Sequence, residues 1–133
     1  YIAQLSMPDM KGPIAYALSY PERIENVMQG LDLDEIKSLV FKKPDYKSFP
    51  CLSYAYMAMQ SRGTMLSVLN AANEVAVDAF LKGMIRFTEI PFVIRETMEG
   101  HEVLPDTDLA VILEADKWAR KKAQEIIKTL QKY

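Results

Sequence analysis

His101 is the only histidine of the chain, and Glu99 and Glu102 flank it. Imidazole titrates near neutral pH and binds metals, so this group could be a general base or a metal site. Residues one and two positions apart do not converge on one point of a helix, however, and Gly100 is a residue type that ends helices. We therefore expect His101 to be a solvated loop histidine.

Cys51 is the only cysteine, and it lies near the expected start of a helix, where the helix dipole can lower a thiol pKa. A nucleophilic cysteine needs a base, and the single histidine lies far along the chain. We expect Cys51 to be a buried structural thiol. A lone cysteine forms no internal disulfide, which excludes a secreted disulfide scaffold.

Asn73 lies in a helix expected over about residues 64–82. With Leu69 at zero on a helical wheel, Asn73 falls at about 40°, inside an apolar arc from about −120° to about +80°. An unpartnered buried amide destabilises a protein by ~1–3 kcal/mol. We expect Asn73 to be a structural amide in the core, bonded to main-chain groups around residues 45–49, and Glu74 to be exposed. A ligand contact is the alternative for Asn73.

The remaining sequence offers no further catalytic pattern. Its five glycines are too dispersed to form a phosphate-binding loop, and no cluster of cysteine and histidine follows metal-ligand spacing. The chain alone therefore predicts no complete active site, and we expect it to bind no cofactor or metal by itself.

Composition excludes several classes of protein. Hydrophobic residues make up 50% of the 133 residues and charged residues 26%, which excludes global disorder. Sixteen basic and eighteen acidic residues give a net charge of −2, which argues against nucleic acid as a partner. No apolar run approaches the ~18–20 residues that span a bilayer, and no signal peptide opens the chain. We expect a soluble, cytoplasmic protein without a membrane partner.

The first 45 residues predict a small truncated α+β segment. Residues 1–6 alternate loosely without a turn or cap, as if they began inside a strand, so we expect a fragment of a larger protein. Residues 14–18 predict a short helix with Asp9 as its N-cap. Residues 39–41 predict one short strand.

Residues 46–133 predict a C-terminal four-helix bundle domain, so the expected fold class is mainly α. Thr88 is the expected N-cap of the third helix, and Asp116 could be a second N-cap that divides the last helix. The four helices are expected over about residues 50–62, 64–82, 88–100 and 108–132. Methionines on these helices usually fill the core, and this is expected of Met57, Met59, Met65 and Met84.

The stretch from Leu69 to Leu81, LNAANEVAVDAFL, closely resembles the C-terminal part of the 1-deoxy-D-xylulose 5-phosphate reductoisomerases. These are NADPH-dependent enzymes of non-mevalonate isoprenoid biosynthesis. The resemblance covers essentially the whole chain, because further segments match in the same order. They are Pro8-Asp9-Met10 with Pro13-Ile14, Pro44-Asp45-Tyr46, Phe49-Pro50-Cys51-Leu52, Ile85-Arg86-Phe87-Thr88 and Glu114-Ala115-Asp116-Lys117-Trp118-Ala119-Arg120.

The resemblance implies a C-terminal fragment of an enzyme that converts 1-deoxy-D-xylulose 5-phosphate to 2-C-methyl-D-erythritol 4-phosphate. It implies that the full enzyme is a homodimer that uses NADPH and Mg²⁺ or Mn²⁺, and that the missing N-terminal and catalytic regions are this chain's partners. Residues 1–45 would be a remnant of the catalytic domain with a connecting segment. Residues 46–133 would be a structural domain, inactive alone.

The segment Pro8-Asp9-Met10 lies beside the nicotinamide in this family, so the resemblance implies that Pro8 and Met10 contact the cofactor. Met10 would offer an apolar surface to the neutral ring. The family usually has arginine and then a larger residue after this methionine, whereas Lys11 and Gly12 stand here. The alternative to the enzyme fragment is a stand-alone helical protein-interaction module.

Overall fold

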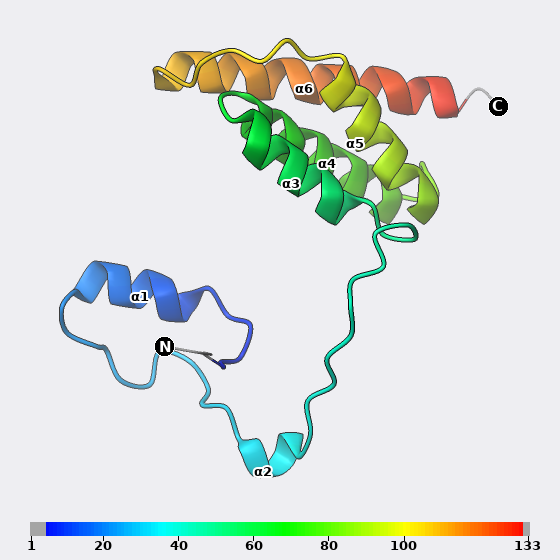
Figure 1. The fold of residues 1–133 in the computed structure, drawn as a ribbon. Helices are drawn as coiled ribbons and strands as arrows, with labels where there is room; N and C mark the ends of the chain where they lie inside the picture. The colour runs from blue at the N-terminus through cyan, green and yellow to red at the C-terminus, as the bar shows by residue number, and fades with distance from the viewer. Residues whose placement is uncertain (1–4, 132–133) are drawn as a thin grey trace. The chain divides into compact units, whose positions relative to one another are not determined.

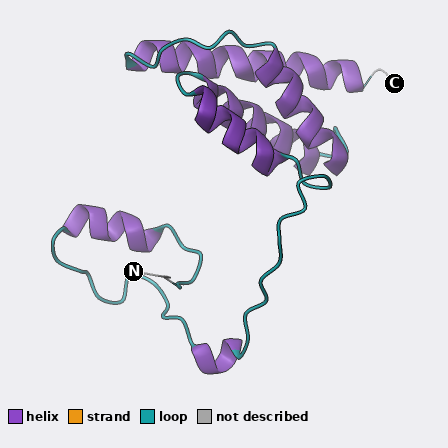
Figure 2. Ribbon diagram, in the orientation of Figure 1, coloured by secondary structure: helices purple, strands orange, loops and turns teal. Residues whose placement is uncertain are grey.

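Figure 1 shows the computed structural model of the chain, which describes residues 5–131. The chain divides into two compact units between Lys42 and Lys43. All regular elements of the described residues are helices, and no strand occurs among them (Figure 2). The structure therefore confirms the mainly α fold class.

The first unit contains two short helices, α1 (Lys11–Ser19) and α2 (Leu33–Ile36). The N-cap of α1 is Met10, but the Asp9 carboxylate still accepts a 2.9 Å hydrogen bond from the Lys11 N–H. Asp32 caps α2 in the usual way, since its side chain accepts from the first free N–H groups of the helix. None of residues 5–42 is buried, so this part of the unit has no hydrophobic core.

The strand expected at residues 39–41 is wrong, because Leu39, Val40 and Phe41 form no regular element and are exposed. A strand is stable only when a neighbouring strand pairs with its N–H and C=O groups, and residues 5–131 supply no such neighbour. Of the other expected strand, residues 1–4 lie outside the described range, and Leu5 and Ser6 form no strand.

The second unit is the expected four-helix arrangement. Its helix α4 lies at the centre, because its contacts with the other three helices are the most extensive of the unit. Buried alanines are frequent on α4 and α6, and such small side chains allow helix backbones to approach closely. The helices are α3 (Cys51–Ser61), α4 (Met65–Leu81), α5 (Ile90–Glu99) and α6 (Leu109–Leu130), with the 3₁₀ turn η1 (Phe87–Glu89) before α5.

Two expected caps of the second unit are wrong, as is the expected Asp9 cap before α1, although the helices themselves form. Thr88 lies inside η1, and the turn begins with an Arg86 N–H that donates a 2.6 Å hydrogen bond to Glu89. Asp116 does not divide the last helix, because α6 is continuous. The Asp116 carboxylate instead accepts a 2.7 Å hydrogen bond from Arg120, one turn further along.

Only Met65 of the four methionines expected in the core is buried. Met57 and Met59 are exposed on α3, and Met84 is exposed in the turn after α4. Helical periodicity places a methionine on a face of a helix, but it does not say whether another element covers that face. The prediction of core packing for these three residues is therefore wrong.

Candidate functional site

The two residues expected to contact a cofactor, Pro8 and Met10, line one cavity of about 790 Å³ in the first unit. Both are exposed, and Met10 leaves 69% of its surface free. The cavity is lined by Ser6, Met7, Pro8, Asp9, Met10, Gly12, Pro13, Tyr16, Arg23 and Met28.

Local contacts hold the wall of this cavity. The Asp9 N–H donates a 2.8 Å hydrogen bond to the carbonyl of Met7, and this bond folds the segment before α1. The Arg23 guanidinium lies over the Tyr16 ring, with Cζ 4.8 Å from the ring centroid. Apolar side chains and one stacked cation suit contact with a flat, weakly polar group.

Gly12 permits a close contact within the same unit. A β-carbon at position 12 would lie 2.5 Å from Sδ of Met28, so a larger residue there would displace the methionine. The departure from the family pattern after Met10 therefore coincides with a place where Met28 packs directly against the backbone of α1.

The described part of the chain does not fit a metal site. Across residues 5–131, no three histidine, cysteine, aspartate or glutamate side chains lie close enough together to hold a metal ion. This geometry gives no support for a metal bound by these residues alone.

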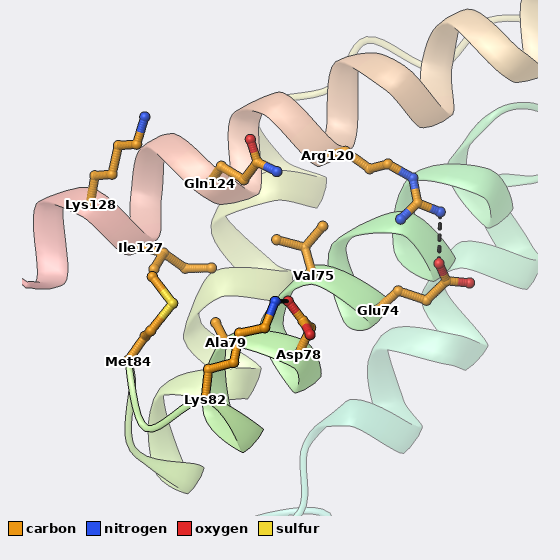
Figure 3. Close-up of a pocket in the computed structure, with 10 residues that line it drawn as sticks. All are labelled: Glu74, Val75, Asp78, Ala79, Lys82, Met84, Arg120, Gln124, Ile127 and Lys128. Carbon is orange, nitrogen blue, oxygen red and sulfur yellow. Dashed lines mark hydrogen bonds and ion pairs between the residues drawn. The ribbon is translucent and has the colours of Figure 1, made fainter.

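A second hollow, of about 560 Å³, lies between α4 and α6 (Figure 3). Its apolar wall consists of Val75, Ala79, Met84 and Ile127. Charged and amide side chains complete the lining: Glu74, Asp78, Lys82, Arg120, Gln124 and Lys128. We call this hollow the α4–α6 groove.

Several charged side chains around the α4–α6 groove form ion pairs with one another. Nζ of Lys82 lies 2.7 Å from the Asp78 carboxylate, and Nη2 of Arg120 lies 2.7 Å from Oε2 of Glu74 (Figure 3). Hydrogen bonds from Arg120 and then Asn70 lower the pKa of Glu74, and hydrogen bonds to Asp116 and then Glu74 raise the pKa of Arg120. The groove thus combines an apolar wall with neutralised charges, which suits packing more than catalysis.

Asn73 is exposed, so the prediction that it lies in the core is wrong. No hydrogen bond joins its side chain to the segment around residues 45–49 or to any other residue in the range 5–131. The apolar arc on α4 is wider than the surface that α3, α5 and α6 cover, since Leu66 on the same flank is also exposed. Glu74 is exposed, as expected.

His101 lies in the connection after α5, as expected of a loop histidine, but it is half-buried, so the prediction that it is solvated is wrong. Its Nε2 lies 2.8 Å from Oγ1 of Thr64, and its ring centroid lies 5.0 Å from that of Trp118. Burial lowers the pKa of His101, against a weaker opposing effect of Glu102. Sequence reasoning missed this contact because Thr64 is 37 positions away and no periodic pattern connects the two residues.

Cys51 is half-buried at the first residue of α3, and burial raises the pKa of its thiol. A raised pKa leaves less thiolate at neutral pH, so the helix start does not activate this cysteine. The structure thus supports the expected unreactive thiol but shows partial rather than complete burial.

The family model of the DXP reductoisomerase C-terminal domain matches residues 5–122. The chain belongs to this family. It is 51% identical over 130 residues to the 1-deoxy-D-xylulose 5-phosphate reductoisomerase of Trichlorobacter lovleyi, and 50% identical over 129 residues to that of Pelotomaculum thermopropionicum. These matches cover 98% and 97% of the chain but 33% of each relative. The chain therefore spans about a third of the length of the curated relatives it matches.

Solved structures of the same family are similar. The Zymomonas mobilis reductoisomerase in complex with NADPH matches with a TM-score of 0.79 and 34% identity, over 95% of this chain and 33% of that one. A DOX-P reductoisomerase in complex with NADPH, fosmidomycin and magnesium matches with a TM-score of 0.76 and 39% identity, over 96% of this chain and 34% of that one. The helical fold is therefore that of the corresponding third of these enzymes.

Proposed function

We propose that this chain is the C-terminal part of a longer protein with 1-deoxy-D-xylulose 5-phosphate reductoisomerase activity. That protein would convert 1-deoxy-D-xylulose 5-phosphate to 2-C-methyl-D-erythritol 4-phosphate with NADPH. The observation that carries the proposal is 51% identity to the Trichlorobacter lovleyi reductoisomerase across 98% of the chain. Family membership favours this function over a stand-alone interaction module.

Within that protein, Pro8 and Met10 would contact the nicotinamide of NADPH. Both line the cavity before α1, and the exposed Met10 offers a polarisable thioether to the face of a ring. Related structures contain NADPH and magnesium, so Mg²⁺ or Mn²⁺ is proposed for the longer protein. Its ligands would come from regions outside this chain, because residues 5–131 contain no suitable cluster.

Residues 1–45 would be a remnant of the catalytic domain with a connecting segment, and residues 46–133 a helical domain that supports it. The isolated chain would be inactive, since neither unit holds a complete set of catalytic groups in its described residues. The remaining regions of the same polypeptide would be its partners, in a cytoplasmic homodimer.

The test compares the full-length protein with the 133-residue chain. With substrate, Mg²⁺ and NADPH, the full-length protein should consume NADPH, and the chain alone should not. A full-length protein without turnover would refute the proposed activity. Turnover by the chain alone would show that a catalytic site lies within it.

Variants of the full-length protein test the cofactor contact separately. Met10→Ala should raise the KM for NADPH several-fold because it removes apolar surface from the ring. Met57→Ala, a matched change at an exposed methionine on α3, should leave KM unchanged. If both variants have the same KM for NADPH while the wild type is active, the proposed cofactor contact is wrong. The proposed activity would still stand.

A further inference from the structure

Thr64 joins two parts of the second unit that are distant in the sequence. It lies immediately before α4 and is fully buried, whereas Leu104 lies in the connection between α5 and α6. The Thr64 N–H donates a 3.0 Å hydrogen bond to the Leu104 carbonyl, and the Leu104 N–H donates a 3.0 Å hydrogen bond to Oγ1 of Thr64. These reciprocal bonds fasten the connection to the start of α4.

The position of one proton follows from these contacts. A hydroxyl has one hydrogen to donate, and the Leu104 N–H already uses a lone pair of the Thr64 oxygen. The other partner of that oxygen within residues 5–131 is Nε2 of His101, at 2.8 Å. The Thr64 hydroxyl is satisfied in both roles only if it donates to Nε2. This arrangement requires a neutral imidazole with its hydrogen on Nδ1.

A proton on Nε2 would reverse this favourable arrangement. Nε2–H and the Leu104 N–H would then both donate to the Thr64 oxygen, and the hydroxyl hydrogen would be left without an acceptor in a buried site. Leaving a buried donor unsatisfied is unfavourable. The positive charge would also lie at the N-terminal end of α4, where the helix dipole favours negative groups.

The charged groups around the imidazole do not offset this effect. Glu102 on the same connection favours the protonated form, but less strongly than burial opposes it. From α6, the neighbours are the uncharged Trp118 ring and the Lys122 side chain, whose Cε lies 3.5 Å from the β-carbon position of Gly100. Arg62, at the end of α3, is exposed to solvent.

We propose that the Thr64–His101 hydrogen bond is a pH-sensitive latch. The neutral imidazole favours the closed arrangement, in which Leu104 is bonded to the start of α4, and protonation of Nε2 destabilises this arrangement. The latch is closed at neutral pH and weakens as the pH falls below about 6.5, the ordinary histidine value, until the imidazole of the closed latch is itself protonated. Opening frees the 101–107 connection, while the packing of the helices on α4 remains.

Nuclear magnetic resonance of the 133-residue chain tests the latch directly, because its single histidine gives an unambiguous imidazole signal. The neutral form should carry its hydrogen on Nδ1, and the titration midpoint should lie below that of the urea-unfolded chain. Hydrogen exchange of the Leu104 amide, corrected for the intrinsic rate, should accelerate as the pH falls below the midpoint of the unfolded chain and level off below the midpoint of His101. The acceleration should be about tenfold for each unit between the two midpoints.

Matched variants separate the latch from general acid destabilisation. Thr64→Ser keeps the hydroxyl and should keep the Nδ1–H tautomer and the coupled exchange. Thr64→Val should lose the coupling between His101 titration and Leu104 exchange. A neutral wild-type His101 with its hydrogen on Nε2 would overturn the proposal, as would Leu104 exchange unchanged across the titration. Both readouts come from the wild type, so they decide the question even if Thr64→Val fails to fold.

Discussion

Nη2 of Arg120 on α6 donates a 2.7 Å hydrogen bond to Oε2 of Glu74 on α4, at the edge of the α4–α6 groove (Figure 3). The same guanidinium donates through Nε and Nη2 to both carboxylate oxygens of Asp116, at 2.7 and 3.1 Å. Arg120 therefore joins the central helix to the longest one. Asp116 holds the guanidinium in place, because it occupies two donors from one turn earlier on the same helix.

We expect Glu74→Gln to lower the melting temperature only slightly at neutral pH, because solvent screens an exposed ion pair. The effect should depend on pH. Hydrogen bonds from Arg120 and then Asn70 lower the pKa of Glu74, so its stabilisation is present above the ordinary value and is lost as the pH falls through the lowered one. Thermal melts of the wild type and of Glu74→Gln at about pH 7 and about pH 3 measure how the destabilisation by the substitution depends on pH.

Glu114→Gln is the matched control, since Glu114 is exposed on α6 and forms no ion pair within the described residues. The melting temperature of the control should change between the two pH values by the same amount as that of the wild type. An equal pH effect in both variants would contradict a specific contribution of the Glu74–Arg120 pair.

We expect Asn73→Leu to change the free energy of unfolding by less than ~0.5 kcal/mol, because the side chain is exposed. The adjacent Ala72 is fully buried, so Ala72→Leu should overpack the core and destabilise by ~1–3 kcal/mol. Urea unfolding of both variants measures the contrast. Strong destabilisation by Asn73→Leu would restore the buried-amide interpretation. If Asn73→Leu instead left the stability of the chain unchanged but removed the proposed activity of the full-length protein, Asn73 would lie against regions outside this chain.

Sequence reasoning missed the short helix α2, but it predicted the four helices of the second unit well because local signals mark their ends. Gly63 and Gly100 follow α3 and α5, and Asp108 caps α6 by accepting a hydrogen bond from the Val111 N–H. The expected strand at residues 39–41 failed because a strand depends on a partner elsewhere in the chain. An apolar triplet alone does not supply one.

The environments of single side chains were predicted less well. Asp116 and Arg120 are four residues apart on a helix, so their pairing can be read from the sequence. The Glu74–Arg120 and Thr64–His101 contacts cannot, because they depend on how α4 meets other elements. The exposure of Asn73 likewise depends on which part of an apolar arc the neighbouring helices cover.

We expect Cys51 to react slowly with iodoacetamide in the folded chain. Its thiol is half-buried and its pKa is raised by burial, so little thiolate is present at neutral pH. The alkylation rate should rise with pH and increase several-fold when urea unfolds the chain. A folded chain that reacts faster than the unfolded one would indicate an activated thiol at the start of α3.

The turn before α4 should be unusually sensitive to substitution at Gly63. Its φ is +52°, a conformation that side chains disfavour, and a β-carbon there would collide with the Leu104 carbonyl oxygen. That oxygen cannot move freely, since it accepts the Thr64 N–H. Gly63→Ala should therefore combine backbone strain with the loss of the contact that fastens the α5–α6 connection.

Substitutions of two other glycines in the same unit distinguish backbone strain from the collision with the Leu104 carbonyl. Gly83 has a φ of +69° but open space around its β-carbon position, so Gly83→Ala should destabilise by about 1–2 kcal/mol through strain alone. Gly100 has a φ of −80° and only ordinary contacts, so Gly100→Ala should have the smallest effect. Urea unfolding should rank Gly63→Ala as the most destabilising, by at least ~1 kcal/mol beyond Gly83→Ala. Equal effects at positions 63 and 83 would mean that the Leu104 carbonyl yields easily and that strain alone matters.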